Sequence, residues 1–176
     1  MTESNLCISI LTLSKRAKYI QLKDRGASWI KKRDPTVCCL QEIHLTCNDT
    51  HRLKVNWWRK ICQANGKQKK KGVAILISDK TDFKPTTIKK HKEGYYIMIK
   101  GSIQKEDLTI LNICTSITGA PAFVKQILLN IRKEINSHVM ILEDFKTPLT
   151  ALGWSLRQKS NKEILNLNWT LNQMDL

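Results

Sequence analysis

The sequence predicts a mixed α/β protein in which one β-sheet packs on another and helices lie outside the sheets. Three observations support this class: short apolar runs of strand length, apolar stripes of helical period between some of them, and a hydrophobic content of 41% over 176 residues. That length and apolar content suit a single domain, residues 1–176, with a buried core.

Six apolar runs are expected to form strands, and several are continuous rather than alternating, as in strands covered on both faces. They span 6–13, 36–41, 73–78, 95–103, 108–114 and 139–142. The third, fourth and fifth runs are expected to form a meander of three strands. Residues 65–72 and 78–94 are expected to be basic connections between elements.

Helical patterns lie between or after these strands. An apolar stripe over residues 22–30 predicts a helix that ends before Pro35, because the residue before a proline is pushed out of the helical region. A second stripe over 123–135 follows Pro121, which suits a first-turn position. The capping-box spacing of Ser160 and Glu163 predicts a third helix near the end of the chain.

The formal net charge of +15 is the strongest signal in the composition. Residues 54–92 hold twelve Lys and Arg against only Asp79 and Asp82. Such clustering attracts polyanions and makes binding dependent on salt, so nucleic acid is the expected partner. A solvated lysine-rich surface without a ligand is the alternative.

Targeting signals and cysteine usage indicate an intracellular protein, nuclear or cytoplasmic and not secreted. No apolar stretch approaches the length of a membrane span, and the first residues lack the order of a signal peptide, so no membrane partner is expected. The six cysteines form no CxxC pair, which suits reduced thiols and excludes a disulfide-linked partner. Cys39, His44, Cys47 and His51 match no common zinc spacing.

Two of the apolar runs end in acidic residues: Glu42 follows the second run, and Glu143 and Asp144 follow the last. In open α/β sheets, ligands bind beyond the carboxyl ends of strands. Carboxylates that meet there suit Mg²⁺, which takes few protein oxygens and fills its other positions with water and phosphate. Surface-exposed acids without a ligand are the alternative interpretation.

Long blocks of the sequence are similar to one known family. The blocks are "LQEIHLTCNDTHRLK" (40–54), "WRKICQANGKQKKKGVAILISDKTDFKPT" (58–86), "KEGYYIMIKGSI" (92–103), "LTILNI" (108–113) and "TGAP" (118–121). They resemble the endonuclease domain of mammalian long interspersed element retrotransposons, a member of the endonuclease/exonuclease/phosphatase family related to apurinic/apyrimidinic endonucleases. The resemblance implies a four-layer α/β sandwich, a C-terminally truncated copy whose second sheet is incomplete, and a Mg²⁺-dependent endonuclease that nicks T/A-rich duplex DNA for retrotransposition.

The resemblance also assigns roles to single positions. Glu42 matches the metal-binding glutamate, and Asp144 matches the aspartate beside the attacking water. Three other site positions differ from the family. Lys146 and Ser14 each occupy a position where the family has an asparagine, and Cys114 occupies one where it has a tyrosine. Lysine only donates hydrogen bonds, whereas an amide donates and accepts. These replacements predict that the degenerate site is catalytically inactive.

Three hypotheses therefore stand beside one another. The first is a DNA-hydrolysing endonuclease, the second a non-catalytic nucleic-acid-binding protein, and the third an unselected product of a decayed retrotransposon copy. The second assigns nucleic-acid contacts to Lys67, Lys69, Lys70, Lys71, Lys89 and Lys90.

Overall fold

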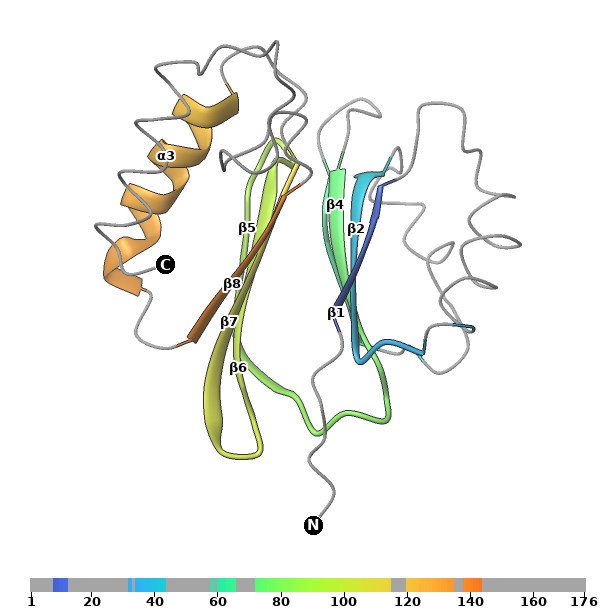
Figure 1. The fold of residues 1–176 in the computed structure, drawn as a ribbon. Helices are drawn as coiled ribbons and strands as arrows, with labels where there is room; N and C mark the ends of the chain where they lie inside the picture. Colours follow the sequence, from blue (N-terminus) through green and yellow to red (C-terminus); the bar gives the residue numbers. More distant parts are fainter. Residues whose placement is uncertain are drawn as a thin grey trace, which may run out of the picture.

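Two four-stranded sheets face each other in the computed structural model, which describes residues 8–12, 32, 34–43, 58, 60–65, 72–114, 120–134 and 138–143 (Figure 1). The first sheet has the order β1-β2-β4-β3, with β1 (Ile8–Thr12), β2 (Val37–Ile43), β3 (Lys60–Ala64) and β4 (Gly72–Ile77). The second has the order β5-β6-β7-β8, with β5 (Lys84–Lys90), β6 (Tyr96–Ile103), β7 (Glu106–Ile113) and β8 (His138–Glu143).

Both sheets are mixed. In the first sheet β1 pairs with β2 in parallel, whereas β4 is antiparallel to both of its neighbours. In the second sheet the β5-β6-β7 meander is antiparallel and β8 adds to β7 in parallel. The connection from β7 to the parallel β8 contains helix α3 (Ala120–Ile131), which continues into the short 3₁₀ turn η3 (Arg132–Glu134).

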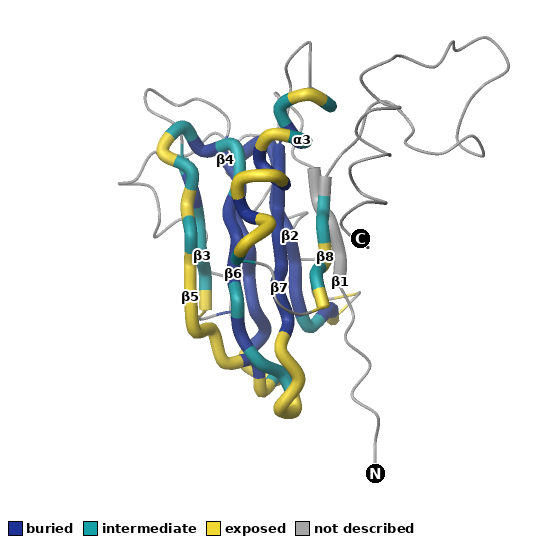
Figure 2. The backbone as a smooth tube through the Cα atoms, turned by 90° about the vertical axis from the view of Figure 1, so that its left-hand side faces the viewer, coloured by how far each residue is buried: buried dark blue, intermediate teal, exposed yellow. Residues whose placement is uncertain are grey.

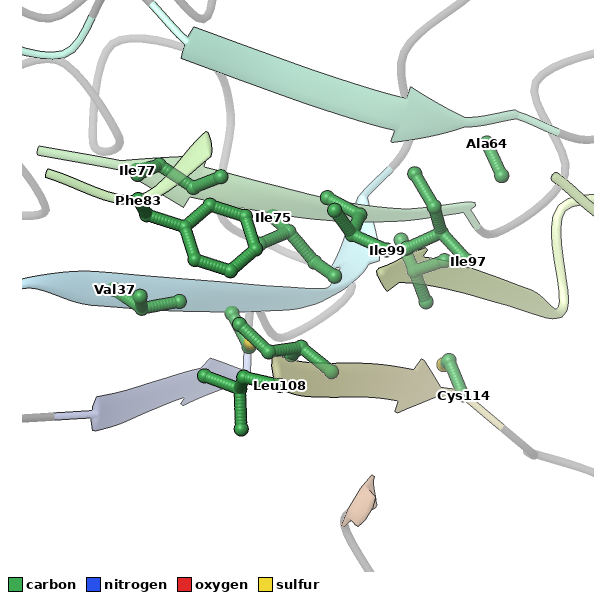
Figure 3. Packing of buried hydrophobic residues seen from close by; sticks show 12 residues of the cluster. Val37, Ala64, Ile75, Ile77, Phe83, Ile97, Ile99, Leu108 and Cys114 are labelled. Carbon is green, nitrogen blue, oxygen red and sulfur yellow. The ribbon is translucent and has the colours of Figure 1, made fainter. Parts of the chain in front are cut away.

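The main core lies between the sheets, where β2 and β4 face β6 and β7 (Figure 3). Alternate side chains point inward, as the period of two along a strand requires. Ile75 and Ile77 of β4 thus meet Ile97 and Ile99 of β6, with Phe83 packed among them at zero exposure.

Helix α3 covers the outer face of the second sheet, on the side away from the first sheet (Figure 1). Its apolar stripe, Val124, Ile127, Leu128 and Ile131, packs on the outward side chains of β6 and β7. Within the described ranges, no helix has the length and apolar character that a membrane crossing requires.

The sheets and α3 confirm the predicted class and all six expected strands. The predicted meander was wrong in one member, because β4 belongs to the first sheet and β5 takes its place beside β6. The sequence analysis missed β3 and β5, which are edge strands with few buried residues. The helices expected over 22–30 and from Ser160 lie outside the described residues, as does Ile135.

Candidate functional site at the strand ends

A side-chain amide of β2 joins the carboxyl ends of three strands from two sheets. Gln41 Nε2 donates to Asn112 Oδ1 at 3.1 Å and to the carbonyl oxygen of Ile113 at 3.0 Å, both on β7. It also lies 3.3 Å from the carbonyl oxygen of Leu142 on β8. The ends of β2, β7 and β8 therefore meet at one end of the sandwich.

Asn112 extends this contact back into the first sheet. Its Nδ2 donates to the carbonyl oxygens of Leu40 on β2 and Ala74 on β4, each at 3.0 Å. Because the partners of Nδ2 are carbonyl oxygens, which only accept, the orientation of the amide is determined and Oδ1 must face Gln41. We call this Gln41–Asn112 pair, with both side chains at zero exposure, the amide bridge.

The amide bridge contributes to stability mainly through the cost of breaking it. A neutral hydrogen bond contributes about 1 kcal/mol net, whereas a buried polar group left without a partner costs ~1–3 kcal/mol. Gln41 Oε1 is itself buried without a hydrogen-bond partner among the described residues. The bridge thus specifies how the two sheets align at this end, since a shift in either sheet would leave further groups unsatisfied.

Glu42 directly follows the bridging glutamine and lies in a β-bulge. The β2–β4 pairing passes from Leu40–Ala74 to Ile43–Gly72, so Gln41 and Glu42 stand opposite the single residue Val73. Glu42 has a φ of 57°, in the left-handed region that a side chain disfavours by roughly 1–2 kcal/mol. Bulges re-aim side chains next to functional sites, and the strain persists because the surrounding sheet imposes it.

Glu42 is 8% exposed and is the only acid of the predicted metal and catalytic positions whose side chain the structure describes. Glu143 ends β8 beside Ile113, but its side chain is not described, and Asp144, Lys146 and Ser14 lie outside the described residues. Within the described part of the chain no three His, Cys, Asp or Glu residues form a metal-binding group. Since Mg²⁺ is commonly held by one or two carboxylates together with substrate phosphate, Glu42 fits as one such ligand.

Cys114 follows β7 at the same end, where the resemblance expects a tyrosine. Its backbone N–H donates to the carbonyl oxygen of Tyr95 at 2.8 Å, and the residue is 7% exposed. A buried thiol is a weak hydrogen-bond donor and cannot reach out to a phosphate as a phenol would.

The described cysteines are thiols, as the sequence analysis expected. Cys38, Cys39, Cys62 and Cys114 form no disulfide. Burial raises the pKa of Cys38 to about 12. Burial also raises the pKa of Cys39, with a second contribution from Cys38. These two thiols on β2 therefore stay protonated, which excludes them as nucleophiles.

The described part of the basic surface lies on β5, an edge strand of the second sheet. The residues of β5 are exposed along nearly its whole length (Figure 2). Lys89 and Lys90 are at its carboxyl end and Lys84 at its start. β5 runs antiparallel to β6 and therefore in the same direction as β7, so Lys89 and Lys90 lie at the end of the sandwich that holds the amide bridge. Lys89 Nζ pairs with Glu134 Oε1 at 2.6 Å, a contact that raises the pKa of Lys89.

The other predicted lysines, Lys67, Lys69, Lys70 and Lys71, lie outside the described residues. They belong to the connection between β3 and β4. The described residues that flank this connection, Asn65 and Gly72, pack closely enough that a Cβ atom on Gly72 would lie 2.8 Å from Asn65 Oδ1. Gly72 pairs with Ile43, next to Glu42.

Sequence reasoning missed Gln41 and Asn112. The available signal was an amide inside a mostly apolar run, since "VCCLQE" and "LTILNIC" each carry one amide side chain where a buried strand was expected. Buried polar groups require partners. That the two amides partner each other across 71 residues of sequence is visible only in the fold.

Solved structures share the fold of this chain, although no family model matches the sequence. The endonuclease domain of TRAS1, a telomere-specific non-LTR retrotransposon, is 12% identical with a TM-score of 0.65, covering 95% of this chain and 69% of that one. An AP endonuclease from Archaeoglobus fulgidus is 14% identical with a TM-score of 0.63, covering 96% and 70%. D. rerio TDP2 complexed with single strand DNA product is 11% identical with a TM-score of 0.59, covering 78% and 58%.

These proteins are members of the endonuclease/exonuclease/phosphatase superfamily. The chain therefore has an endonuclease/exonuclease/phosphatase-like fold, as the sequence resemblance implies. It spans 47% to 61% of the length of the C. elegans TDP2 chains that it also matches.

Proposed function

We propose that this chain binds nucleic acid at the end of the sandwich where β2, β7 and β8 finish, on the frame of a Mg²⁺-dependent endonuclease whose hydrolytic activity is lost. The amide bridge is the observation that carries the proposal. It holds the strand end that bears Glu42 against the ends of β7 and β8. Lys90 lies at the same end and would attract the phosphate backbone, whereas the neighbouring Lys89 is paired with Glu134.

The fold supports phosphodiester chemistry as the ancestral activity. The similar structures include two endonucleases and a TDP2 that holds single strand DNA. By resemblance the ancestral substrate is T/A-rich duplex DNA, nicked for retrotransposition. Glu42 would hold Mg²⁺, which when bound supplies positive charge to a scissile phosphate. Asp144 would accept a proton at the same site.

The loss of activity follows from the positions that should hold the phosphate. Cys114 is a buried thiol in place of a phenol, and Lys146 and Ser14 replace two amides. Removing one preorganised donor typically lowers the rate by ~10²–10³-fold, and members of a catalytic unit are not additive. With three such positions changed, hydrolysis is expected to fall below detection.

A plasmid nicking assay tests the loss of activity. Supercoiled plasmid is incubated with Mg²⁺ and the wild-type chain, beside Glu42→Gln and Asp144→Ala variants. The expected result is the same trace for all three proteins. Nicking that requires Mg²⁺ and disappears in both variants would instead establish a working endonuclease, which the likeness to the TRAS1 endonuclease domain favours.

Binding is tested by a salt titration with two matched lysine variants on β5. Lys90 ends the strand on the proposed surface, whereas Lys84 begins it, roughly 20 Å away at about 3.3 Å per residue. Lys90→Gln is expected to weaken binding of a DNA oligonucleotide and to reduce the log–log salt slope by about 0.7–0.9. Lys84→Gln should leave both unchanged. Equal effects of the two variants, or an affinity that does not change with salt concentration, would contradict the proposed surface.

The remaining hypothesis, an unselected product of a decayed copy, predicts a chain without a stable fold. Cooperative thermal unfolding with a single transition would contradict that hypothesis.

A further inference from the structure

Four aromatic rings gather where the β5–β6 turn meets the first turn of α3. The His91 ring lies 5.4 Å from that of Tyr95 and 5.1 Å from that of Tyr96, measured between centroids. Phe123 of α3 contacts Tyr95 edge-to-face, with centroids 5.3 Å apart and planes at 74°. We call His91, Tyr95, Tyr96 and Phe123 the aromatic cluster.

The aromatic cluster is fixed on one side and open on the other. All four residues are partly exposed. Tyr96 and Phe123 pack against the core beneath α3, whereas His91 and Tyr95 belong to neither the inter-sheet core nor the α3 core. Two rings thus anchor the cluster, and two are held against them with part of their surface facing solvent.

Backbone hydrogen bonds hold the turn that carries His91 and Tyr95. The N–H of His91 donates to the carbonyl oxygen of Tyr96 at 3.0 Å, and the N–H of Gly94 donates to the carbonyl oxygen of His91 at 3.0 Å. Gly94 has a φ of 77°, which a glycine adopts without strain. The N–H of Glu93 donates to His91 Nδ1 at 3.2 Å and thereby orients the imidazole. The exposed rings are therefore preorganised, so a ligand would not have to order them.

The turn that carries the aromatic cluster is joined to the lysines at the end of β5 and to the end of β7. Lys89 and Lys90 immediately precede His91 along the chain, and Lys92 follows it. On the other side, the carbonyl oxygen of Tyr95 accepts from the N–H of Cys114, the residue that follows Ile113. Because Gln41 contacts the Ile113 carbonyl oxygen, these hydrogen bonds connect the turn that carries the rings to the carboxyl end of β2.

We propose that the aromatic cluster is a stacking platform for the unpaired bases of single-stranded DNA or RNA, with the neighbouring lysines holding the phosphate backbone. This inference rests on the proposed nucleic-acid binding and narrows it to strands with accessible base faces. A positively charged track beside partly exposed, preorganised rings suits a polyanion that also carries π faces. Duplex bases are stacked on each other and offer only their edges, so the platform favours single strands.

Oligonucleotides of equal length and different bases test this inference without altering the protein. Oligo-dT, oligo-rU and an abasic deoxyribose oligomer carry matched phosphate charge, and fluorescence anisotropy at fixed low salt measures the binding of each. Stacking contributes ~1–3 kcal/mol per base, so the base-bearing strands should bind about 5- to 150-fold more tightly than the abasic strand. Tighter binding of oligo-dT than of oligo-rU identifies DNA as the preferred ligand, and tighter binding of oligo-rU identifies RNA.

The outcomes separate this inference from the proposed function. Equal affinity for abasic and base-bearing strands, with clear binding of both, overturns the stacking platform and leaves nucleic-acid binding intact. No binding of any strand at low salt overturns both.

Substitutions at Tyr95 assign the effect to the cluster. Tyr95→Phe keeps the ring and should preserve the preference for oligo-dT over the abasic strand to within about twofold. Tyr95→Leu keeps apolar bulk against Phe123 without a π face and should lower that preference by about 5- to 150-fold, with affinity for the abasic strand unchanged. A thermal unfolding curve accompanies each variant. A folded Tyr95→Leu protein that retains the full preference would contradict the assignment.

Discussion

Replacing Asn112 by aspartate tests the amide bridge with almost no change in shape. The Nδ2 atom that donates to the carbonyl oxygens of Leu40 and Ala74, at 3.0 Å each, becomes an oxygen that faces two other oxygens. Because Asn112 has zero exposure, the new carboxylate has no access to water. Ionisation would place an uncompensated charge between the sheets.

The size of the effect follows from these contacts. Two hydrogen bonds of about 1 kcal/mol each are lost, and leaving buried carbonyl groups without their donor adds ~1–3 kcal/mol. From these contacts alone, Asn112→Asp should lower the free energy of unfolding by about 3–5 kcal/mol, a large share of the ~5–15 kcal/mol of a typical domain.

The loss should also depend on pH in a definite direction. Burial raises the pKa of the introduced aspartate in the folded state above its unfolded value of about 3.9. The folded state then binds more protons than the unfolded state, so stability falls as the pH rises from about 4 until the folded pKa is passed, at ~1.4 kcal/mol per pH unit. Protonation at low pH also restores one donor.

Urea unfolding followed by circular dichroism at pH 5 and pH 8 measures both effects. Asn112→Leu is the control without a titratable group. It removes the same two Nδ2 hydrogen bonds and also the oxygen that accepts from Gln41, a loss that does not change with pH. The difference between the aspartate and leucine variants should be larger at pH 8 than at pH 5. A loss below about 1 kcal/mol at pH 8, or a difference between the variants that does not change with pH, would refute the bridge as described.

Three further expectations concern single residues. Gly101→Ala should destabilise the fold by ~1–3 kcal/mol in thermal unfolding, because a Cβ atom there would lie 2.5 Å from the carbonyl oxygen of Lys84 and 2.5 Å from the ring of Phe83; an unchanged transition temperature would contradict this packing. Glu42→Gly should be about 1–2 kcal/mol more stable than Glu42→Ala, because only glycine accepts the φ of 57° without strain; equal stabilities would mean that the bulge relaxes. Cys38 should resist thiol reagents at pH 8 in the folded protein, since its pKa is raised to about 12, and rapid labelling without unfolding would contradict its burial. Its contribution to stability should decline as the pH rises above about 9, where the thiol of the unfolded chain ionises.

The strands that build the site were predictable because each contains a mostly apolar run. β2 and β7 each lie between two other strands of their sheet, so most of their residues are buried and apolar. β5 reads "KPTTIKK" and is exposed along nearly its whole length. Proline and lysine on an edge strand prevent pairing with other chains. Because these residues replace apolar ones, the strand shows no apolar periodicity in the sequence.

The connections across the sheets were beyond sequence reasoning. The amide bridge joins residues 71 positions apart, and the aromatic cluster joins the β5–β6 turn to Phe123. Neither contact follows from a local sequence pattern. Both depend on the placement of β4 in the first sheet, outside the expected meander, and on the packing of α3 against the second sheet. A meeting of strand ends could be predicted, whereas the groups that hold those ends together could not.

Hydrogen–deuterium exchange with and without oligo-dT tests most directly whether nucleic acid occupies the end of the sandwich that holds the amide bridge. The β5–β6 turn, residues 91–95, lies at that end, and the β6–β7 turn at Gln104 and Lys105 lies at the opposite end (Figure 1). Oligo-dT should slow exchange of the amides in 91–95 and leave those of 104–105 unchanged. Protection of 104–105 instead, or of neither turn at saturating oligonucleotide, would place the ligand elsewhere and contradict the proposed surface.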